Sequence, residues 1–120
     1  MLKSQFIPNP YGMTEDRFED FRGKVIYAIG ETEICIAQLK RGGSRNDGRR
    51  MRIQTLWRDL AKIYMRTSTG GSELPERFEE FADVFDRSGL ADDDFIALCE
   101  SYLEEIREVA ARERLKISDA

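Results

Sequence analysis

The sequence predicts an all-α protein, an antiparallel bundle of about four helices with an extended N-terminal arm. Three observations favour this class. Apolar residues recur at helical spacing in four stretches, short Gly-, Ser- or Asp-containing segments separate those stretches, and the 35% content of charged residues is typical of a solvated helical protein. Residues 1–120 suffice for a single domain with a core that needs no disulfides. Short connections between amphipathic helices favour antiparallel packing.

The N-terminal arm is predicted at 1–13, because two prolines and a glycine interrupt regular structure there. Thr14 then supplies an N-cap, with Glu15 and Asp16 in the first turn of a long helix at about 14–41. The apolar stripe of this helix alternates spacings of three and four residues. It consists of Phe18, Phe21, Val25, Ala28, Thr32, Cys35 and Leu39.

A β-hairpin at 24–38 is the alternative for the middle of this helix, with VIYAI and EICIA as its strands. Gly23 and Gly30 favour the hairpin, because each costs a helix interior about 1 kcal/mol relative to alanine. The uninterrupted helical period favours the helix. Ile26 and Ile34 lie off the centre of the buried stripe, which leaves room for a second, exposed stripe and for a homo-oligomer.

Three further helices are predicted after the C-cap pair Gly42-Gly43, at about 50–67, 75–87 and 92–115. Proline suits the first turn of the second of these helices, and three aspartates would cap the last one and complement its dipole. Their apolar stripes are Ile53, Leu56, Trp57, Leu60, Ile63 and Tyr64, then Phe78, Phe81, Ala82 and Phe85, and finally Phe95, Leu98, Cys99, Tyr102, Leu103, Ile106, Val109 and Ala110.

The composition argues against several kinds of site. There is no histidine, the commonest general base and transition-metal ligand. No nucleophile–base pair or metal-ligand set can be assembled by spacing, so we expect neither catalysis nor a cofactor. Cys35 and Cys99 fall within apolar patterns and are expected to be buried thiols. Without an apolar run of about eighteen residues or a signal-peptide pattern, we expect a cytoplasmic protein that does not enter a membrane.

Positive charge is concentrated at 40–66, called the basic segment below. It holds nine basic residues and two acids, whereas the chain as a whole has a net charge of −4 and residues 73–120 hold fifteen acids against six bases. The basic residues are Lys40, Arg41, Arg45, Arg49, Arg50, Arg52, Arg58, Lys62 and Arg66. Because arginine suits bidentate phosphate contact, the first hypothesis is a non-catalytic subunit of a larger assembly that binds nucleic acid, RNA rather than DNA, or another phosphate-bearing partner.

The second hypothesis is a protein–protein adaptor or inhibitor, including an inhibitor of phage type. Its acidic half at 73–120 would meet a basic surface, or one of its helical stripes would complete a partner's bundle. The basic segment would then only balance the acidic half, within the chain or in a partner.

The motifs SRNDGRR and WRDLAKI, together with FIALCESYLEEI near the end, carry a resemblance to a known family. Their order resembles the helical small subunit of type III CRISPR effector complexes, where a basic loop joins the first two helices. The chain departs from that family by lacking a long basic middle helix and by its acidic last helix. The resemblance implies a CRISPR-associated subunit of antiviral defence that lies along the guide–target duplex. The backbone contacts that it implies are Arg49, Arg50, Arg52 and Arg58.

Overall fold

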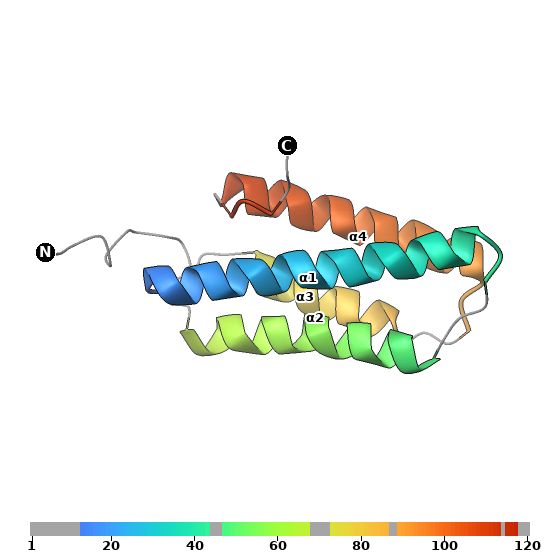
Figure 1. Cartoon of the computed structure of the whole chain (residues 1–120), viewed down its shortest axis with the longest axis horizontal. Coiled ribbons are helices and arrows are strands. Elements are labelled where there is room, and N and C mark those ends of the chain that lie inside the picture. Colours follow the sequence, from blue (N-terminus) through green and yellow to red (C-terminus); the bar gives the residue numbers. More distant parts are fainter. Residues whose placement is uncertain (1–12, 44–46, 68–72, 87–88, 114, 118–120) are drawn as a thin grey trace, which may run out of the picture.

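The computed structural model describes residues 13–43, 47–67, 73–86, 89–113 and 115–117, without the side chains of residues 47 and 64–67. These ranges hold four helices, which are α1 (Glu15–Lys40), α2 (Asp47–Thr67), α3 (Leu74–Val84) and α4 (Asp92–Arg112). Consecutive helices run in opposite directions (Figure 1), so the predicted all-α antiparallel bundle is confirmed. The predicted arm lies outside the described residues except for Met13, which is buried.

Helix α1 continues without a break through residues 24–38, so the hairpin alternative is wrong. Its start agrees with the sequence. Thr14 has an extended backbone (φ −65°, ψ 163°), and its Oγ1 accepts a hydrogen bond of 3.4 Å from the Arg17 N–H. This is the geometry of an N-cap. The burial of a long apolar stripe thus outweighs the helix-propensity cost of the two interior glycines.

A glycine in the left-handed backbone conformation follows the end of α1. Gly42 has a φ of 85°. Its N–H donates to the Leu39 carbonyl at 3.0 Å, and the Gly43 N–H donates to the Gln38 carbonyl at 3.0 Å. The two bonds form a Schellman motif and confirm the predicted C-cap pair. Position 42 needs glycine because of its positive φ. Position 43 needs glycine because a Cβ there would lie 2.8 Å from the Gln38 carbonyl oxygen.

The later helices differ from the prediction mainly at their ends. Pro75 lies in the first turn of α3, as expected, but α3 ends at Val84, earlier than predicted. The N-cap of α4 is Ala91, whose side chain makes no capping hydrogen bond, so the expected aspartate cap is wrong. The three aspartates at 92–94 occupy the first turn, where their charge complements the helix dipole.

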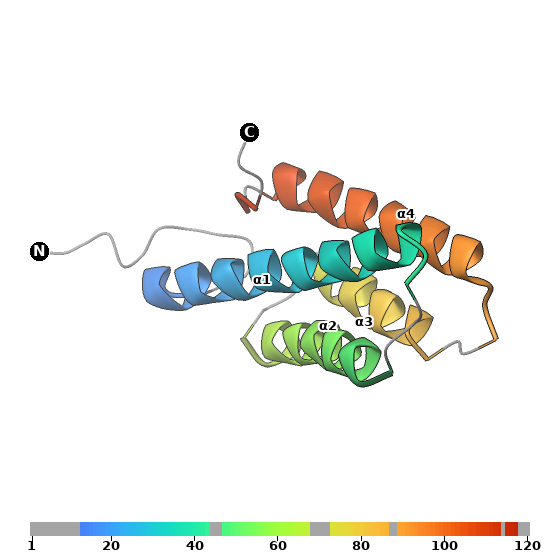
Figure 2. The ribbon, with the colours of Figure 1, turned by 45° about the vertical axis from the view of Figure 1, so that its right-hand side comes forward.

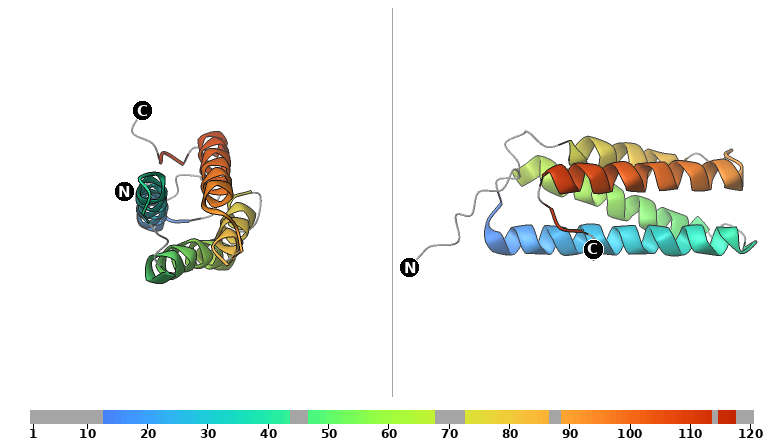
Figure 3. Two further views of the ribbon diagram at one scale, coloured as in Figure 1. Left: turned by 90° about the vertical axis from the view of Figure 1, so that its right-hand side faces the viewer. Right: turned by 90° about the horizontal axis from the view of Figure 1, so that it is seen from above.

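Aromatic side chains form the centre of the core. Viewed along the bundle, the helices follow one another around it, with α3 between α2 and α4 (Figure 2, Figure 3). The fully buried Trp57 of α2 has its ring centroid 4.9 Å from that of Phe81 and 5.5 Å from that of Phe78, both on α3. Its indole N–H donates to Thr32 Oγ1 of α1 at 3.0 Å. Phe81 also stacks on Tyr102 of α4, so this cluster joins all four helices.

After α4 the chain turns back toward α1 (Figure 3). Leu115 is buried, and its N–H donates to the Ala110 carbonyl at 2.8 Å. The Lys116 carbonyl accepts a hydrogen bond of 2.8 Å from Arg22 Nη1 of α1. The last helix therefore ends before residue 115, its predicted end, and the residues beyond it cover part of α1.

Two further expectations concern the cysteines and membrane spans. Cys35 and Cys99 are buried and unbridged, as expected. None of the helices that the structure describes combines the length and the apolar composition of a membrane span. Burial of the core thus accounts for the apolar stripes of these helices.

Replacing glycine by alanine should have opposite effects on stability just after the end of α1 and inside α1. Gly42→Ala should lower the free energy of unfolding by about 1 kcal/mol, because alanine is strained in the left-handed region. Gly30→Ala should raise it by about 1 kcal/mol, since the new methyl group meets no atom within 4 Å and alanine is the better helix former. Urea unfolding of the chain at monomeric concentration, followed by circular dichroism, measures both values, and a destabilised Gly30→Ala monomer would contradict the helix geometry described here.

Candidate interaction surfaces

Three cations of the basic segment are paired with carboxylates of other helices. Lys40 Nζ lies 2.6 Å from Glu100 Oε2 of α4. Arg52 Nη2 lies 2.9 Å from Glu31 Oε1 of α1. The third, Arg58, faces α3. These pairs join residues at least 21 positions apart, and those of Lys40 and Arg58 match the alternative that the basic segment balances the acidic half within the chain.

Arg58 lies among three carboxylates. Its guanidinium contacts Glu79 at 2.8 Å, Asp83 at 3.2 Å and Asp86 at 3.3 Å. The hydrogen bond to Asp83 raises the pKa of Arg58 above its ordinary value, and the negative charges of Glu79, Asp83 and Asp86 raise it further, against the effect of desolvation. One positive and three negative groups leave this site negative, so it would repel a phosphate.

Arg50 is buried and belongs to the core rather than to a water-facing cluster. Its side chain is 9% exposed, Nη2 donates to the Phe85 carbonyl at 2.7 Å, and the guanidinium lies 5.8 Å from the centre of the Phe95 ring. Contact between Arg50 and a nucleic-acid backbone stays a prediction, and the burial of Arg50 in this fold does not favour it. The sequence contained the signal, because Arg50 precedes Ile53 by three residues and Trp57 by seven, which places it on the buried stripe of α2.

The other predicted residues do not form one cluster either. Arg41 and Lys62 are exposed, and neither forms an ion pair with a carboxylate that the structure describes. Arg49 is half-buried in the first turn of α2. Arg45 and the side chain of Arg66 lie outside the described residues. Arg41 follows α1 and Lys62 lies towards the end of α2, so they are at opposite ends of the bundle.

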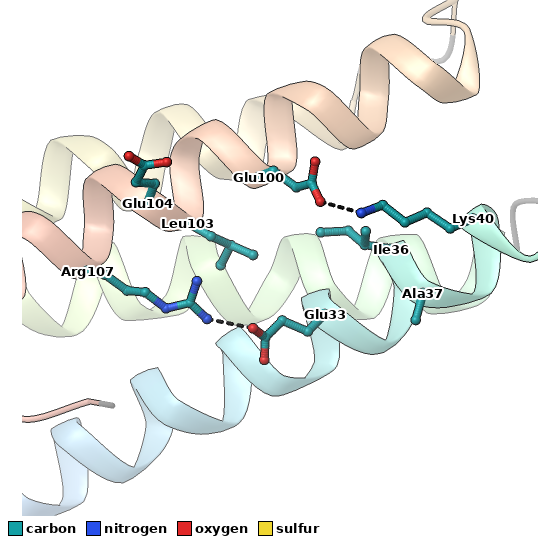
Figure 4. A pocket seen from close by; sticks show the side chains of 8 residues that line it. All are labelled: Glu33, Ile36, Ala37, Lys40, Glu100, Leu103, Glu104 and Arg107. Carbon is teal, nitrogen blue, oxygen red and sulfur yellow. Dashed lines mark hydrogen bonds and ion pairs between the residues drawn. The ribbon is translucent and has the colours of Figure 1, made fainter. Parts of the chain in front are cut away.

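An open groove of about 430 Å³ lies between α1 and α4. Two ion pairs span it, Lys40–Glu100 and Arg107–Glu33, the latter with 2.6 Å between Arg107 Nη2 and Glu33 Oε2 (Figure 4). Ile36 and other apolar side chains line it between these pairs. Both cations that line the groove are already neutralised by carboxylates, so it offers no unpaired positive charge to an anionic ligand.

The outer face of α1 is apolar and exposed. We use this name for Gly23, Ile26, Tyr27, Gly30, Ile34 and Ala37, which recur at helical spacing on the side opposite the buried stripe. Ile26 is 39%, Tyr27 55% and Ile34 46% exposed. Glu31 and Glu33, which flank this face, are held by Arg52 of α2 and Arg107 of α4. Ion pairs with neighbouring helices thus draw the flanking carboxylates sideways and leave the face free of charge along its middle.

Among the described residues, no group of three or more Cys, Asp or Glu side chains is arranged to hold a metal ion. The three carboxylates around Arg58 are occupied by its guanidinium. The surfaces that remain for function are the outer face of α1 and the exposed cations.

No protein-family model, curated protein or solved structure matches the chain. The resemblance to the small subunit of type III CRISPR effector complexes therefore stays a prediction that rests on three short motifs. The inferences below depend on the geometry of the chain alone.

Replacing Arg50 should affect stability rather than ligand binding. Arg50→Met keeps much of the apolar stem but leaves the Phe85 carbonyl without its charged donor, so the free energy of unfolding should fall by about 2 kcal/mol. Arg41→Met, at an exposed position, should change it by less than about 0.5 kcal/mol. Urea titrations of the two variants give the comparison, and equal stabilities would show that Arg50 is not a core residue.

Proposed function

We propose that this protein is a non-catalytic cytoplasmic interaction module that docks on another polypeptide through the outer face of α1. The exposure of Ile26, Tyr27 and Ile34 on one face carries this proposal. An exposed, continuous apolar patch on a small domain is typical of an interaction site, whereas single exposed apolar residues need no explanation. A partner helix or a partner groove would bury these side chains.

The ion pairs between helices support this function over phosphate binding. A phosphate that approached Lys40 or Arg52 would have to displace Glu100 or Glu31, and at Arg58 it would meet three carboxylates. Charge that is neutralised inside the molecule releases no counterions when a nucleic acid binds, and counterion release supplies much of the affinity of such complexes. Most of the described part of the basic segment therefore stabilises the bundle.

A second candidate function is the binding of RNA or another phosphate-bearing partner, including the role implied by the CRISPR resemblance. The exposure of Arg41 and Lys62 without described carboxylate partners favours it. Within the basic segment, only these two described cations are both exposed and without a described carboxylate partner, so contacts would be few. The affinity should then depend only weakly on salt, with a slope of about 0.9 per phosphate contacted on a duplex.

A photo-crosslinking amino acid at position 27, compared with one at the exposed Met51 of α2, separates the two functions. In nuclease-treated cells, the variant that carries this amino acid in place of Tyr27 should form a covalent adduct with a polypeptide. The adduct should disappear when the variant also carries Ile34→Glu. The position-51 variant should give none. Complex formation from the purified components, again lost with Ile34→Glu, completes the test.

A retardation assay with RNA and DNA at two salt concentrations provides the other arm. Under the main proposal the protein shifts neither nucleic acid. The second candidate would be established by a shift that the double variant Arg41→Ala/Lys62→Ala abolishes and that Arg52→Ala leaves intact. If, in addition, no polypeptide adduct forms at position 27, the first candidate is refuted.

A further inference from the structure

We infer that the outer face of α1 is covered by the same face of a second copy of this chain, with the two α1 helices antiparallel about a two-fold axis near Gly30. The inference rests on the proposed function, because it names the polypeptide that docks on this face. Symmetric dimers bring the same patch of both subunits together, so the patch must be complementary to itself. The arrangement of residues about Gly30 meets this requirement.

Apolar residues are placed symmetrically about Gly30. In an antiparallel pair centred there, residues equidistant from Gly30 face one another, so Ile26 of one copy meets Ile34 of the other, and Gly23 meets Ala37. Tyr27 of one copy then also lies beside Ile34 of the other copy. Each exposed large side chain of this face is covered once in each copy, which is what an isologous interface requires.

The glycines in this face have no explanation within one chain. A Cβ added at Gly23 or Gly30 would meet no atom within 4 Å. Neither glycine serves a turn, since both lie inside α1, where each costs about 1 kcal/mol relative to alanine. Small residues at a helix crossing let two backbones approach more closely than the usual 8–10 Å between helix axes. A second helix across Gly30, with Ile26 and Ile34 interlocking on either side, accounts for both positions.

The charges at the two ends of α1 select the antiparallel orientation. The first turns of the helix expose acids, including Glu15, Asp16 and Glu19, whereas Arg41 at the other end is exposed and has no described carboxylate partner. Antiparallel pairing about Gly30 places Glu19 of one copy, whose carboxylate also contacts Arg22 of its own chain at 3.1 Å, opposite Arg41 of the other. Parallel pairing would bring acids against acids at one end and align the two helix dipoles, which is unfavourable.

The charges beside the apolar face do not oppose this contact. Glu31 and Glu33 would otherwise lie near their own counterparts at the centre of the dimer. Instead Arg52 and Arg107 hold them at 2.9 Å and 2.6 Å on the two sides of α1. The interface therefore has an uncharged centre, with charged residues at its ends.

The mass of the purified full chain tests self-association. Light scattering after gel filtration should give twice 13.9 kDa, falling to 13.9 kDa for Ile34→Glu. Met51→Glu places the same charge on an exposed apolar residue of α2 and should leave the dimer intact. Gly30→Leu should abolish the dimer, because leucine blocks the close approach, and the dissociated chain should stay folded, because leucine favours the helix. A monomeric wild-type chain at every concentration would overturn the inference.

Cysteine crosslinking tests the orientation. Gly30→Cys should form a disulfide between two copies under mild oxidation, because the axis passes beside this residue. Gly23→Cys should not, since the two residues would be roughly 21 Å apart along the helix at 1.5 Å per residue. Crosslinking at both positions would indicate a parallel pair and contradict the proposed geometry. The unmodified chain, whose cysteines are both buried, is the control for background oxidation.

The inference and the proposed function can fail separately. If the wild-type chain is monomeric and position 27 still crosslinks to a different polypeptide in a manner that depends on Ile34, the self-association is refuted and the docking function stands. If Ile34→Glu changes neither the mass nor any adduct, both are refuted.

Discussion

The packing of Trp57 against Thr32 is the constraint on which the rest of the bundle depends. The indole N–H donates to Thr32 Oγ1 at 3.0 Å, and that hydroxyl donates in turn to the Ala28 carbonyl at 2.8 Å. Both side chains are fully buried, so neither the indole nor the hydroxyl could exchange this bond for one with water. A shift of α2 along α1 by one turn would leave the buried indole N–H unsatisfied, while the Thr32 hydroxyl would keep only its bond to the Ala28 carbonyl within α1. The bond therefore fixes which side of α1 faces inward and, with it, which side is left for a partner.

The same register explains why the cations of the basic segment act within the molecule. Once α2 is fixed against α1 and α3, Arg52 reaches Glu31 and Arg58 reaches the acids of α3. The chain is acidic overall, and positive groups of the basic segment, together with Arg77 of α3 and Arg107 of α4, form its ion pairs between helices. Individual surface ion pairs contribute little, about 0.2–1 kcal/mol each, but those around Arg58 share one guanidinium and act as a network. The consequence for function is a reduction in the charge available to ligands.

Local patterns predicted the helices, and tertiary contacts decided the site. The Thr14 cap, the Gly42-Gly43 ending and the apolar stripes depend on residues within a turn or two of each other, so they could be predicted from spacing alone. The partners of Arg52 and Arg58 lie more than twenty residues away and depend on how the helices pack, which no linear pattern records. Arg50 is intermediate, because its spacing matched the buried stripe but its charge suggested exposure. The outer face of α1 was foreseeable in part, from Ile26 and Ile34, whereas the sideways pull on its flanking acids was not.

The residues after α4 connect the two ends of the described chain. Leu115 fills a place in the core, and the Lys116 carbonyl holds Arg22 on the first helix. Proteolytic trimming of only a few residues at this point would empty the core position that Leu115 fills and remove the hydrogen-bond acceptor of Arg22 on α1. A protease that nicked the tail would thereby loosen the helix whose opposite side is proposed to meet a partner.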